Sequence, residues 1–501
     1  MVTNIDAALQ EAVGNELEKG IQLAQSQQAS TGAQLLGTTA SAVVVDVTNG
    51  AVLAMASAPN YDPNQFIGTL SEADYAKLSD PNASNPLISR AYQAAFPPGS
   101  TFKGASATAI LANGMTTPTT VSECPPYYTV PGTDYRFNNF EGEAPGPKTV
   151  TGALEVSCDT YFYKFAYDAW VKDGGLRATP KDRAKPAKEI FTKNAKSFGY
   201  GSDTGIDLPN ESAGIIYDRE ALKKYWEATK ADACKGAQTY KTSDPARAQL
   251  DAYNCTDGWR LQAGNAVQFA IGQGANVEVT PLQQAMAYAA IGNGGTVWEP
   301  QIAKAFIKPD GTVDKVVQPK AKNKLDAAQI QALSTVRDGL KLVVQGPEGT
   351  ARGAGFPAEL DVGGKTGTAD VAEEGPLKGQ VESWFTSLQP IDNPKYAVVV
   401  LVEHGGQGAS TAAKVVANIY KDIYGLGGHA AVWPNGQRPT ALPKISPTGA
   451  ITPPQSNPIP VTPQAPLAPG TPDPVAVANA LQAKAEADAA AARKKAAEES
   501  P

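Results

Sequence analysis

The sequence predicts an α+β domain in which one antiparallel sheet is assembled from both ends of the chain. A β-hairpin pattern follows a helical pattern near the N-terminus, and two further β-rich runs, 383–389 and 396–403, lie near the other end. Between them, residues 100–345 carry mostly helical patterns. We expect this helical part to pack against the sheet and to leave a cleft where the two meet.

The elements at the chain ends follow from local patterns. Residues 5–24 are predicted to form an amphipathic helix, because apolar side chains recur there at near-helical spacing: Ile5, Leu9, Val13, Leu17 and Ile21. Residues 42–45 and 51–54 flank Asn49-Gly50, and an Asn-Gly pair is the strongest short-range hairpin signal. A helix is predicted over 410–424, after the last strand.

Two segments differ in composition from the rest of the chain. Residues 219–260 are polar and rich in Lys, Asp and Ala, which predicts an insertion that projects from the surface. From residue 425 onward the chain is rich in proline, and its last part, 478–501, is rich in Ala, Lys and Glu. We therefore predict a folded domain over 1–424 and a disordered tail over 425–501.

Composition narrows the classes of function. The 501 residues carry a formal net charge of −7, from 43 Lys and Arg against 50 Asp and Glu, so no nucleic-acid partner is expected. Only two histidines occur, His404 and His429, which argues against a His-rich metal site, and no metal or cofactor is expected. No apolar run is long enough to span a bilayer, and no signal peptide is visible.

The four cysteines leave alternatives open. No two of them form a C-x-x-C pair, so a zinc or redox motif is not indicated. Cys234 and Cys255 bracket a polar segment and could form a local disulfide. Cys158 fits a buried small residue or a bridge to Cys124 better than it fits a reactive thiol.

The first chemical motif is Ser-Thr-Phe-Lys at 100–103, which follows Pro97-Pro98-Gly99. A helix is expected to begin at or just after Ser100, so Ser100 and Lys103 lie on one helix face. A lysine whose pKa is lowered by burial can take the serine proton, and a helix N-terminus directs an N–H group toward a developing oxyanion. Taken alone, the pattern also fits an N-capping serine beside a solvated lysine.

Two later motifs complete a set. Lys-Thr-Gly-Thr at 365–368 offers a cation, hydroxyl donors and a glycine that permits close approach, although it also fits an ordinary turn. Ser-Cys-Asp at 157–159, before the aromatic run 161–163, fits a helix cap when taken alone. S-x-x-K, S-x-[ND] and K-T-G in this order form the signature of serine penicillin-recognising enzymes.

Beyond these motifs, the sequence resembles the transpeptidase domain of class B penicillin-binding proteins. The likeness covers roughly residues 2–424 and includes further segments: 53–57, 61–64, 271–274 and 280–283. Asp159 resembles the elongation type, penicillin-binding protein 2, more than the division type, which usually has asparagine there. The resemblance implies the penicillin-binding transpeptidase fold, an antiparallel sheet flanked by helices plus an all-helical subregion.

The resemblance also implies an activity and its residues. The expected reaction is D,D-transpeptidation, which cross-links peptidoglycan stem peptides ending in D-Ala-D-Ala, and β-lactam antibiotics would acylate the same serine. Ser100 would be the nucleophile, Lys103 its base and Ser157 a proton relay. Backbone N–H groups of Ser100 and Thr368 would hold the oxyanion. The expected substrate-binding residues are Asp159, Lys365, Thr366, Gly367 and Thr368.

Related activities and the cellular setting follow from the same likeness. A D,D-carboxypeptidase, a β-lactamase of the same fold and a non-catalytic penicillin-binding scaffold or sensor remain alternatives. Family members carry a membrane helix and a pedestal before this domain, so we expect this chain to be a fragment of a membrane-anchored, extracytoplasmic protein. The expected partner is a membrane glycosyltransferase of the elongation machinery, and a Cys234–Cys255 disulfide would be permitted in that compartment.

Overall fold

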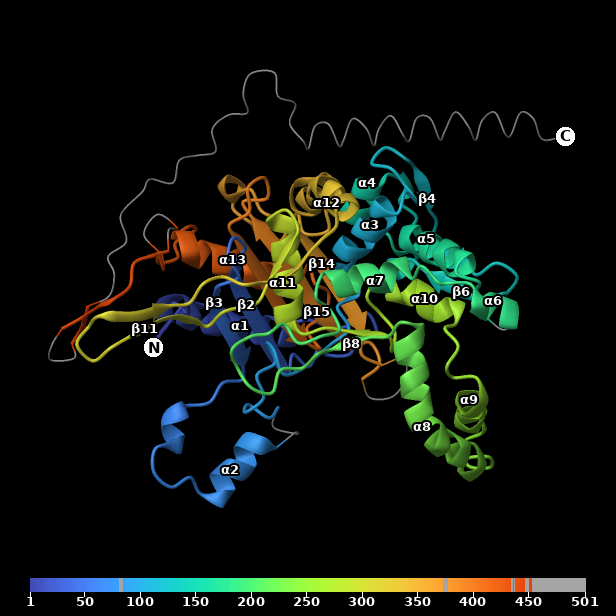
Figure 1. Cartoon of the computed structure of the whole chain (residues 1–501), viewed down its shortest axis with the longest axis horizontal. Coiled ribbons are helices and arrows are strands. Elements are labelled where there is room, and N and C mark those ends of the chain that lie inside the picture. The colour runs from blue at the N-terminus through green and yellow to red at the C-terminus, as the bar shows by residue number, and fades with distance from the viewer. Residues whose placement is uncertain are drawn as a thin grey trace.

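The core of the domain is one five-stranded antiparallel sheet made from both ends of the chain (Figure 1). A computed structural model describes residues 1–80, 84–177, 179–372, 377–433, 436, 438–446 and 450–452. In sheet order the strands are β14 (Gly363–Asp370), β15 (Val381–Gln389), β16 (Tyr396–Glu403), β2 (Thr39–Asp46) and β3 (Val52–Ala58). Because β16 pairs with β2, the sheet joins the two ends as the sequence predicted.

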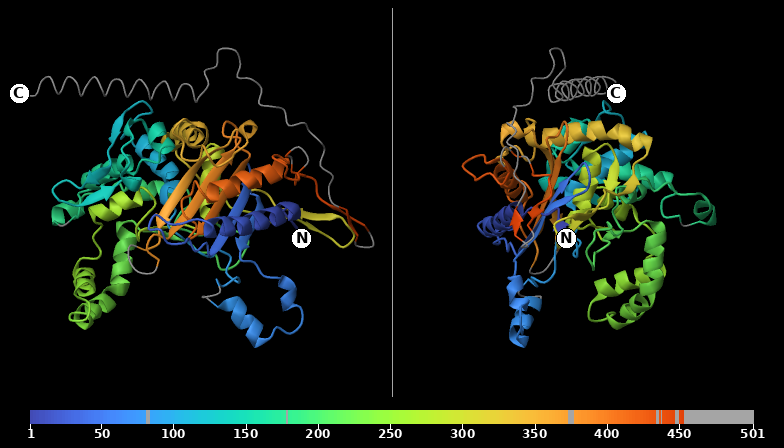
Figure 2. Two further views of the ribbon diagram at one scale, coloured as in Figure 1. Left: turned by 180° about the vertical axis from the view of Figure 1, so that it is seen from behind. Right: turned by 60° about the vertical axis from the view of Figure 1, so that its left-hand side comes forward.

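Helices cover both faces of this sheet. On one face lie α1 (Ala7–Gln25) and α13 (Ala412–Tyr424), which are seen in front of the strands in the left panel of Figure 2. On the other face lies α11 (Pro281–Gly292). Side chains of β2 alternate between the two cores, with Val44 on the α1–α13 side and Val43 on the α11 side. The strands are therefore almost wholly buried.

The helical subregion lies between β3 and β14 in sequence and packs beside the β14 edge of the sheet, mainly through α12 and the turn at Gly99–Phe102. Its helices are α3 (Lys103–Ala112), α4 (Val150–Glu155), α5 (Asp159–Lys172), α6 (Pro180–Ala184), α7 (Ile190–Ser197), α10 (Ala263–Phe269) and α12 (Ala327–Gln345). The small helix α2 (Glu72–Ser79) stands apart from the sheet (Figure 1). Short 3-10 helices span Pro63–Phe66, Gly99–Phe102, Phe140–Gly142 and Ala358–Leu360.

Short strands form small two- and three-stranded sheets around this core. They are β1 (Val2–Thr3), β4 (Ser122–Cys124), β5 (Tyr127–Thr129), β6 (Arg136–Asn138), β7 (Gly146–Lys148), β8 (Ile215–Ile216), β9 (Val277–Glu278), β10 (Thr296–Trp298), β11 (Ala303–Ile307), β12 (Val313–Val316), β13 (Ala321–Lys324), β17 (Lys444–Ile445) and β18 (Ile451–Thr452). Among the described residues, no helix combines the length and the apolar character that crossing a bilayer requires.

The polar segment 219–260 forms a helical hairpin that projects from the helical subregion (Figure 1). Its helices are α8 (Arg219–Thr239) and α9 (Pro245–Thr256), and each has a single fully buried residue. A disulfide between Cys234 and Cys255 joins the two helices. The hairpin therefore rests on local contacts more than on a hydrophobic core of its own.

The folded part of the chain continues past the boundary that composition indicated at residue 424. Trp433 is 1% exposed, its ring lies 5.5 Å from that of Tyr396, and its Nε1 donates to Asp6 Oδ2 at 2.9 Å. One buried aromatic side chain thus holds the segment after α13 on the sheet and α1. The remainder of the predicted disordered tail, 453–501, lies outside the described residues.

Candidate active site

The first motif lies at the junction of two helices. Gly99–Phe102 form a single 3-10 turn, and α3 begins at Lys103, whose N–H donates to the Ser100 carbonyl. Side chains at i and i+3 of a 3-10 turn lie in line, so those of Ser100 and Lys103 face the same way. Ser100 is half-buried, whereas Lys103 is fully buried. The helix begins where the sequence predicted it.

The second motif meets the first at the Lys103 ammonium group. Lys103 Nζ donates to the Ser157 carbonyl at 2.6 Å, to Ser157 Oγ at 3.2 Å and to Asp159 Oδ1 at 2.5 Å. Ser157 adopts a left-handed backbone conformation, with φ of 57°, just before α5. This turn directs both its carbonyl and its hydroxyl oxygen toward one amine.

The third motif lies on β14, the edge strand of the main sheet. Lys365 is fully buried, and its Nζ donates to the Thr366 carbonyl at 3.3 Å and to Thr366 Oγ1 at 3.5 Å. Thr366 Oγ1 also lies 2.8 Å from Thr350 Oγ1. Thr368 Oγ1 accepts from the Gly408 N–H at 3.3 Å. The lysine and both threonine hydroxyl groups therefore have defined positions along one strand.

The first and third motifs touch through backbone atoms. Gly99 has φ of +52°, and a Cβ atom placed on it would lie 2.6 Å from the Thr368 carbonyl oxygen and 3.1 Å from its nitrogen. The Gly99 N–H donates to the Gly272 carbonyl at 2.9 Å, and Gly272 (φ +76°) has no room for a Cβ either. Sequence reasoning assigned no such role to Gly99 or Gly272, although residues 271–274 belonged to the family likeness.

A groove begins beside the third motif. It has a volume of about 390 Å³ and runs from Thr368 toward the loop that precedes α13. Its polar lining includes Glu141, Gln273, Thr368, Asp370, Gln407 and Ser410. Gln273 Nε2 also donates to the Thr368 carbonyl at 3.4 Å. These side chains offer hydrogen-bond donors and acceptors to a peptide, beside apolar residues such as Leu35 and Phe140.

Burial governs the charge state of both lysines. It lowers the pKa of Lys103, although the neighbouring Asp159 carboxylate acts in the opposite direction. The pKa of Lys365 is lowered further, by burial first and then by the charge of Lys103, against the pull of Asp159. A lysine with a lowered pKa has a larger neutral fraction and can accept a proton. The expected effect of Asp159 on Lys103 is present, but desolvation outweighs it.

The comparison with known protein families identifies this constellation. The family described as Penicillin binding protein transpeptidase domain matches residues 40–425. The chain belongs to this family. The transpeptidase domain thus contains all three motifs, together with the sheet and the helical subregion that carry them.

Relatives of this transpeptidase domain include curated peptidoglycan enzymes. The peptidoglycan D,D-transpeptidase MrdA of Haemophilus influenzae is 31% identical over 396 residues, which cover 77% of this chain and 53% of that protein. The peptidoglycan D,D-transpeptidase PbpA of Mycolicibacterium smegmatis is 28% identical over 383 residues, or 75% of this chain and 64% of that protein. The chain spans about half the length of the MrdA relatives it matches.

Solved structures agree with these relatives. PBP2 of Pseudomonas aeruginosa in complex with WCK 5153 matches with a TM-score of 0.64 and 28% identity, over 86% of this chain and 80% of that one. PBP2 of Helicobacter pylori in complex with MreC matches with a TM-score of 0.61 and 26% identity, over 82% and 63%. The predicted fold and the class B, elongation-type assignment are confirmed.

A disulfide borders the second motif of this transpeptidase domain. Cys124, at the end of β4, is joined to Cys158, which caps α5 between Ser157 and Asp159. Asn139 Oδ1 accepts the Asp159 N–H at 2.9 Å. Cys158 is therefore a bridged residue and not a thiol. The sequence offered no signal for Asn139, because its contact with the motif arises only from the tertiary fold.

A tryptophan behind β14 supports the first motif. Trp384 is fully buried on β15, and its Nε1 donates to the Pro97 carbonyl at 3.0 Å. A side chain at Gly367 has no room, because its Cβ would lie 2.8 Å from the Pro98 carbonyl oxygen and 2.9 Å from both Thr101 Cγ2 and Trp384 Cβ. Trp384 therefore positions the turn that carries Ser100 and does not line the groove. The glycine of the third motif is required by its close approach to the Pro98 backbone and to the Thr101 and Trp384 side chains.

Proposed function

We propose that this domain is a serine D,D-transpeptidase that cross-links peptidoglycan stem peptides ending in D-Ala-D-Ala. The single observation that carries the proposal is the fully buried Lys103, which follows Ser100 by one turn and contacts Ser157 and Asp159. An amine of this kind can serve as a general base at neutral pH. The names of the MrdA and PbpA relatives support the same reaction.

The first half of the reaction forms an acyl-enzyme. Ser100 Oγ attacks the carbonyl of the penultimate D-alanine while neutral Lys103 accepts the hydroxyl proton. Backbone N–H groups of Ser100 and Thr368 hold the oxyanion, and each such donor typically contributes about 3–4 kcal/mol to the transition state. The C–N bond then breaks, Ser157 relays a proton to the departing D-alanine amine, and the peptide stays bound to Ser100 as an ester.

The second half transfers the peptide to an acceptor. The amine of a neighbouring stem peptide attacks the ester carbonyl, and Lys103 takes the proton that the amine loses. The C–O bond to Ser100 breaks, the serine oxygen recovers a proton, and a new amide bond joins the two stems. A β-lactam amide would be opened by the first half in the same way, leaving Ser100 acylated.

The strand β14 supplies recognition of the terminal carboxylate. Lys365, Thr366 and Thr368 offer one amine and two hydroxyl groups along one strand, with Asp159 close to the two lysines. An incoming carboxylate would raise the lowered pKa of Lys365, because an opposite charge favours the protonated amine. Substrate binding would thus charge the residue that binds it. Gly367 lets β14 pack closely against Pro98 and Thr101, beside the turn that carries Ser100.

We extend the proposal to the setting of the full-length protein. The H. pylori PBP2 relative was solved with MreC, and another matched structure is described as a peptidoglycan synthase complex that coordinates polymerization and crosslinking. These names support a partner that polymerises peptidoglycan. We propose that this partner is a membrane glycosyltransferase of the elongation machinery and that the full-length protein is membrane-anchored and extracytoplasmic. Two disulfides in the described part of the chain are compatible with an oxidising compartment.

Labelling with a fluorescent penicillin tests the nucleophile. The wild-type chain should form a stable one-to-one adduct, and Ser100→Ala should abolish it, whereas Ser243→Ala, an exposed serine between α8 and α9, should label normally. Mass spectrometry of the intact adduct locates the label. Unchanged labelling of the Ser100→Ala variant would overturn the assignment.

Product analysis separates the related activities. A stem pentapeptide supplied with an acceptor amine should release D-alanine and yield the cross-linked dimer. A hydrolysed tetrapeptide alone would indicate a carboxypeptidase, and rapid turnover of a chromogenic cephalosporin would indicate a β-lactamase. Absence of both label and D-alanine release would indicate a non-catalytic scaffold.

A further inference from the structure

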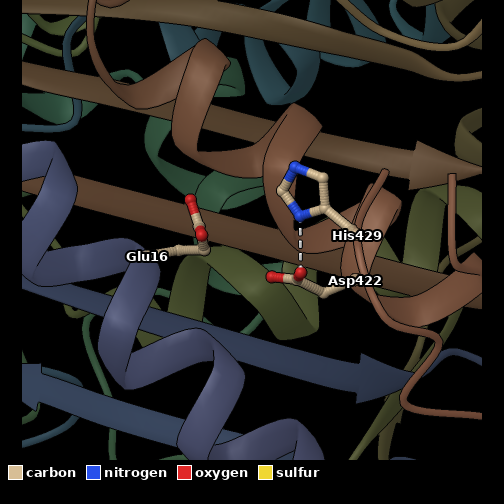
Figure 3. Close-up of side chains that lie close together, drawn as sticks. All are labelled: Glu16, Asp422 and His429. Carbon is tan, nitrogen blue, oxygen red and sulfur yellow. Dashed lines mark hydrogen bonds and ion pairs between the residues drawn. The ribbon is translucent and has the colours of Figure 1, made fainter. Parts of the chain in front are cut away.

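Three potential metal ligands meet where α1 lies against α13. Glu16 comes from α1, Asp422 from α13 and His429 from the segment that follows α13 (Figure 3). One ligand atom from each residue lies within 4.8 Å of the others. His429 Nδ1 is 2.6 Å from Asp422 Oδ1, and both side chains are directed toward the Glu16 carboxylate. This face of the sheet is opposite the face that carries α11.

Both carboxylates of the cluster are largely buried. The Glu16 side chain is only 2% exposed, and that of Asp422 is 14% exposed. The one ammonium group that contacts Glu16 among the described residues belongs to Lys19, whose side chain is 62% exposed and lies 2.5 Å from Glu16 Oε1. The partner of Asp422 is the His429 ring, and largely buried carboxylates such as these two interact strongly with a cation.

The donor set matches the chemistry of a transition-metal ion. Carboxylate oxygens and imidazole nitrogen are zinc ligands, and three protein ligands leave one position for water. Ligand atoms of a tetrahedral zinc, each about 2.0–2.2 Å from the metal, lie about 3.3–3.6 Å from one another. To bind zinc, His429 Nδ1 and Asp422 Oδ1 would move slightly apart from 2.6 Å, and ligand atoms now up to 4.8 Å apart would move closer together. Rotations of the three side chains can achieve both changes.

We propose that Glu16, Asp422 and His429 form a binding site for one Zn²⁺ ion that joins α1 to the chain after α13. The ion would replace the Lys19 ammonium group beside Glu16, and the Lys19 side chain can turn into solvent. It would also replace the proton shared by His429 and Asp422, and that proton would be released. Asn418 Nδ2, 2.9 Å from Glu16 Oε2, would remain to orient that carboxylate.

The position of His429 gives the site a structural consequence. Gly425 ends α13 in the left-handed conformation (φ +68°) and reverses the chain direction. His429 therefore contacts Asp422, which lies in the last turn of α13. His429 lies beyond residue 425, where the family match ends. Zinc would therefore fix the returning segment, including buried Trp433, against the N-terminal helix. Such a clamp would belong to this chain and not to the family match.

Zinc binding to the full chain tests the proposal. After treatment with a chelator, the protein should bind one Zn²⁺ per chain in equilibrium dialysis or calorimetry, and its melting temperature should rise with zinc. Co²⁺ should give the visible absorption of a tetrahedral site. His404→Gln removes the only other histidine and should bind zinc as the wild type does. No binding, or no change in melting temperature with zinc, would overturn the proposal.

Variants at the cluster distinguish a metal site from an ordinary ion pair. Glu16→Gln, which keeps the shape of the side chain, and His429→Gln should each weaken zinc binding by more than about tenfold, since even outer-shell changes at zinc sites cost that much. Lys19→Met removes the competing ammonium group and should tighten binding. Unchanged affinity in Glu16→Gln and His429→Gln, or weaker binding in Lys19→Met, would show that zinc binds elsewhere.

Discussion

Cys124–Cys158 joins β4 to the N-terminus of α5, whereas Cys234–Cys255 joins the two helices of the projecting hairpin. Both cysteines of the first pair are fully buried, and Cys158 lies between Ser157 and Asp159 in the chain. The second pair is half-buried and far from any motif in sequence. The two bonds join cysteines 34 and 21 residues apart, and the entropy of closing a loop changes only with the logarithm of its length. Their contribution to stability should therefore be similar, and their contribution to chemistry should not.

The surroundings of the two disulfides differ in how exactly the backbone must be placed. Around Ser100, backbone groups approach so closely that glycine is required, and one amine reaches three oxygens of the second motif. In the α8–α9 hairpin, contacts are made by side chains, such as the Trp226 Nε1 that donates to the Asn254 carbonyl at 2.6 Å. Side chains can adjust to a substitution, whereas opposed backbone segments cannot.

The largest contrast is expected between two glycines. Gly99→Ala places a methyl group against the Thr368 backbone at a residue with positive φ, so it should separate the two oxyanion donors. The rate of penicillin acylation should fall by about 10²–10³-fold, the loss seen when one such donor is removed.

Gly236→Ala in α8 is the matched control for Gly99→Ala. Its methyl group meets only the end of the Asp251 side chain, which can move, and alanine favours a helix by about 1 kcal/mol. We expect unchanged acylation and a slightly higher melting temperature for this variant. Equal acylation rates in both variants would contradict the role given to Gly99.

The two disulfides should give the next largest contrast. Replacing Cys124 and Cys158 together by alanine frees the turn that holds Ser157, and a displacement of about 1 Å at a catalytic group can cost about 10²-fold in rate. Replacing Cys234 and Cys255 together should leave acylation unchanged. Both changes should lower the unfolding free energy by about 2–4 kcal/mol in denaturant titrations.

The two double cysteine variants must be compared at equal foldedness. Acylation is measured on protein shown to be folded at 25 °C, so that loss of stability does not mimic loss of chemistry. A similar loss of acylation in both double variants would indicate that the Cys124–Cys158 bond acts on stability alone.

A smaller effect is expected from the charge beside Lys103. Asp159 raises the pKa of Lys103 against the larger lowering by burial, so Asp159→Asn should lower that pKa further while retaining an oxygen for the hydrogen bond. Since the base must be neutral, the acid-side limb of the acylation rate should move to lower pH. Asp251→Asn on α9 should leave the profile unchanged. A limb that moved to higher pH would contradict the assignment of Lys103 as the base.

Local patterns predicted much of this molecule. The Asn49-Gly50 hairpin, the helix after Ser100 and the three motifs all depend on residues close together in the sequence, and the structure has each where it was expected. The sheet made from both chain ends was also predictable, because the hairpin pattern near the N-terminus and the runs 383–389 and 396–403 are strongly β-rich. The short strands between them, such as β11 and β12, were not predicted. The resemblance to a family supplied the meeting of the motifs, which spacing alone does not give.

What the sequence did not reveal depends on contacts between distant segments. Gly99 matters because it packs against the backbone of Thr368, and Asn139 because it accepts the Asp159 N–H. Both contacts form only when the chain folds, so neither is visible in the sequence. Trp433 is a single aromatic residue in a proline-rich stretch, so average composition hid its burial. The competition between burial and Asp159 at Lys103 likewise requires a known degree of burial, which no pattern measures.

The smallest free-energy change should come from the buried lysine of β14. Lys365 has a pKa well below 10.5 because it is desolvated, so between that lowered pKa and 10.5 the unfolded chain binds more protons, and stability rises with pH. Lys365→Met should remove this dependence and raise the unfolding free energy by about 1 kcal/mol, most at the low end of that range and not at all above about pH 10.5. The variant should also lose affinity for penicillin, as a carboxylate-binding residue would. Lys223→Met, which removes an exposed i,i+4 partner of Glu227 in α8, should leave the pH dependence of unfolding as it is. If Lys365→Met destabilised the domain at neutral pH, Lys365 would already be protonated and stabilised in the free domain. The proposal that substrate binding protonates Lys365 would then be wrong.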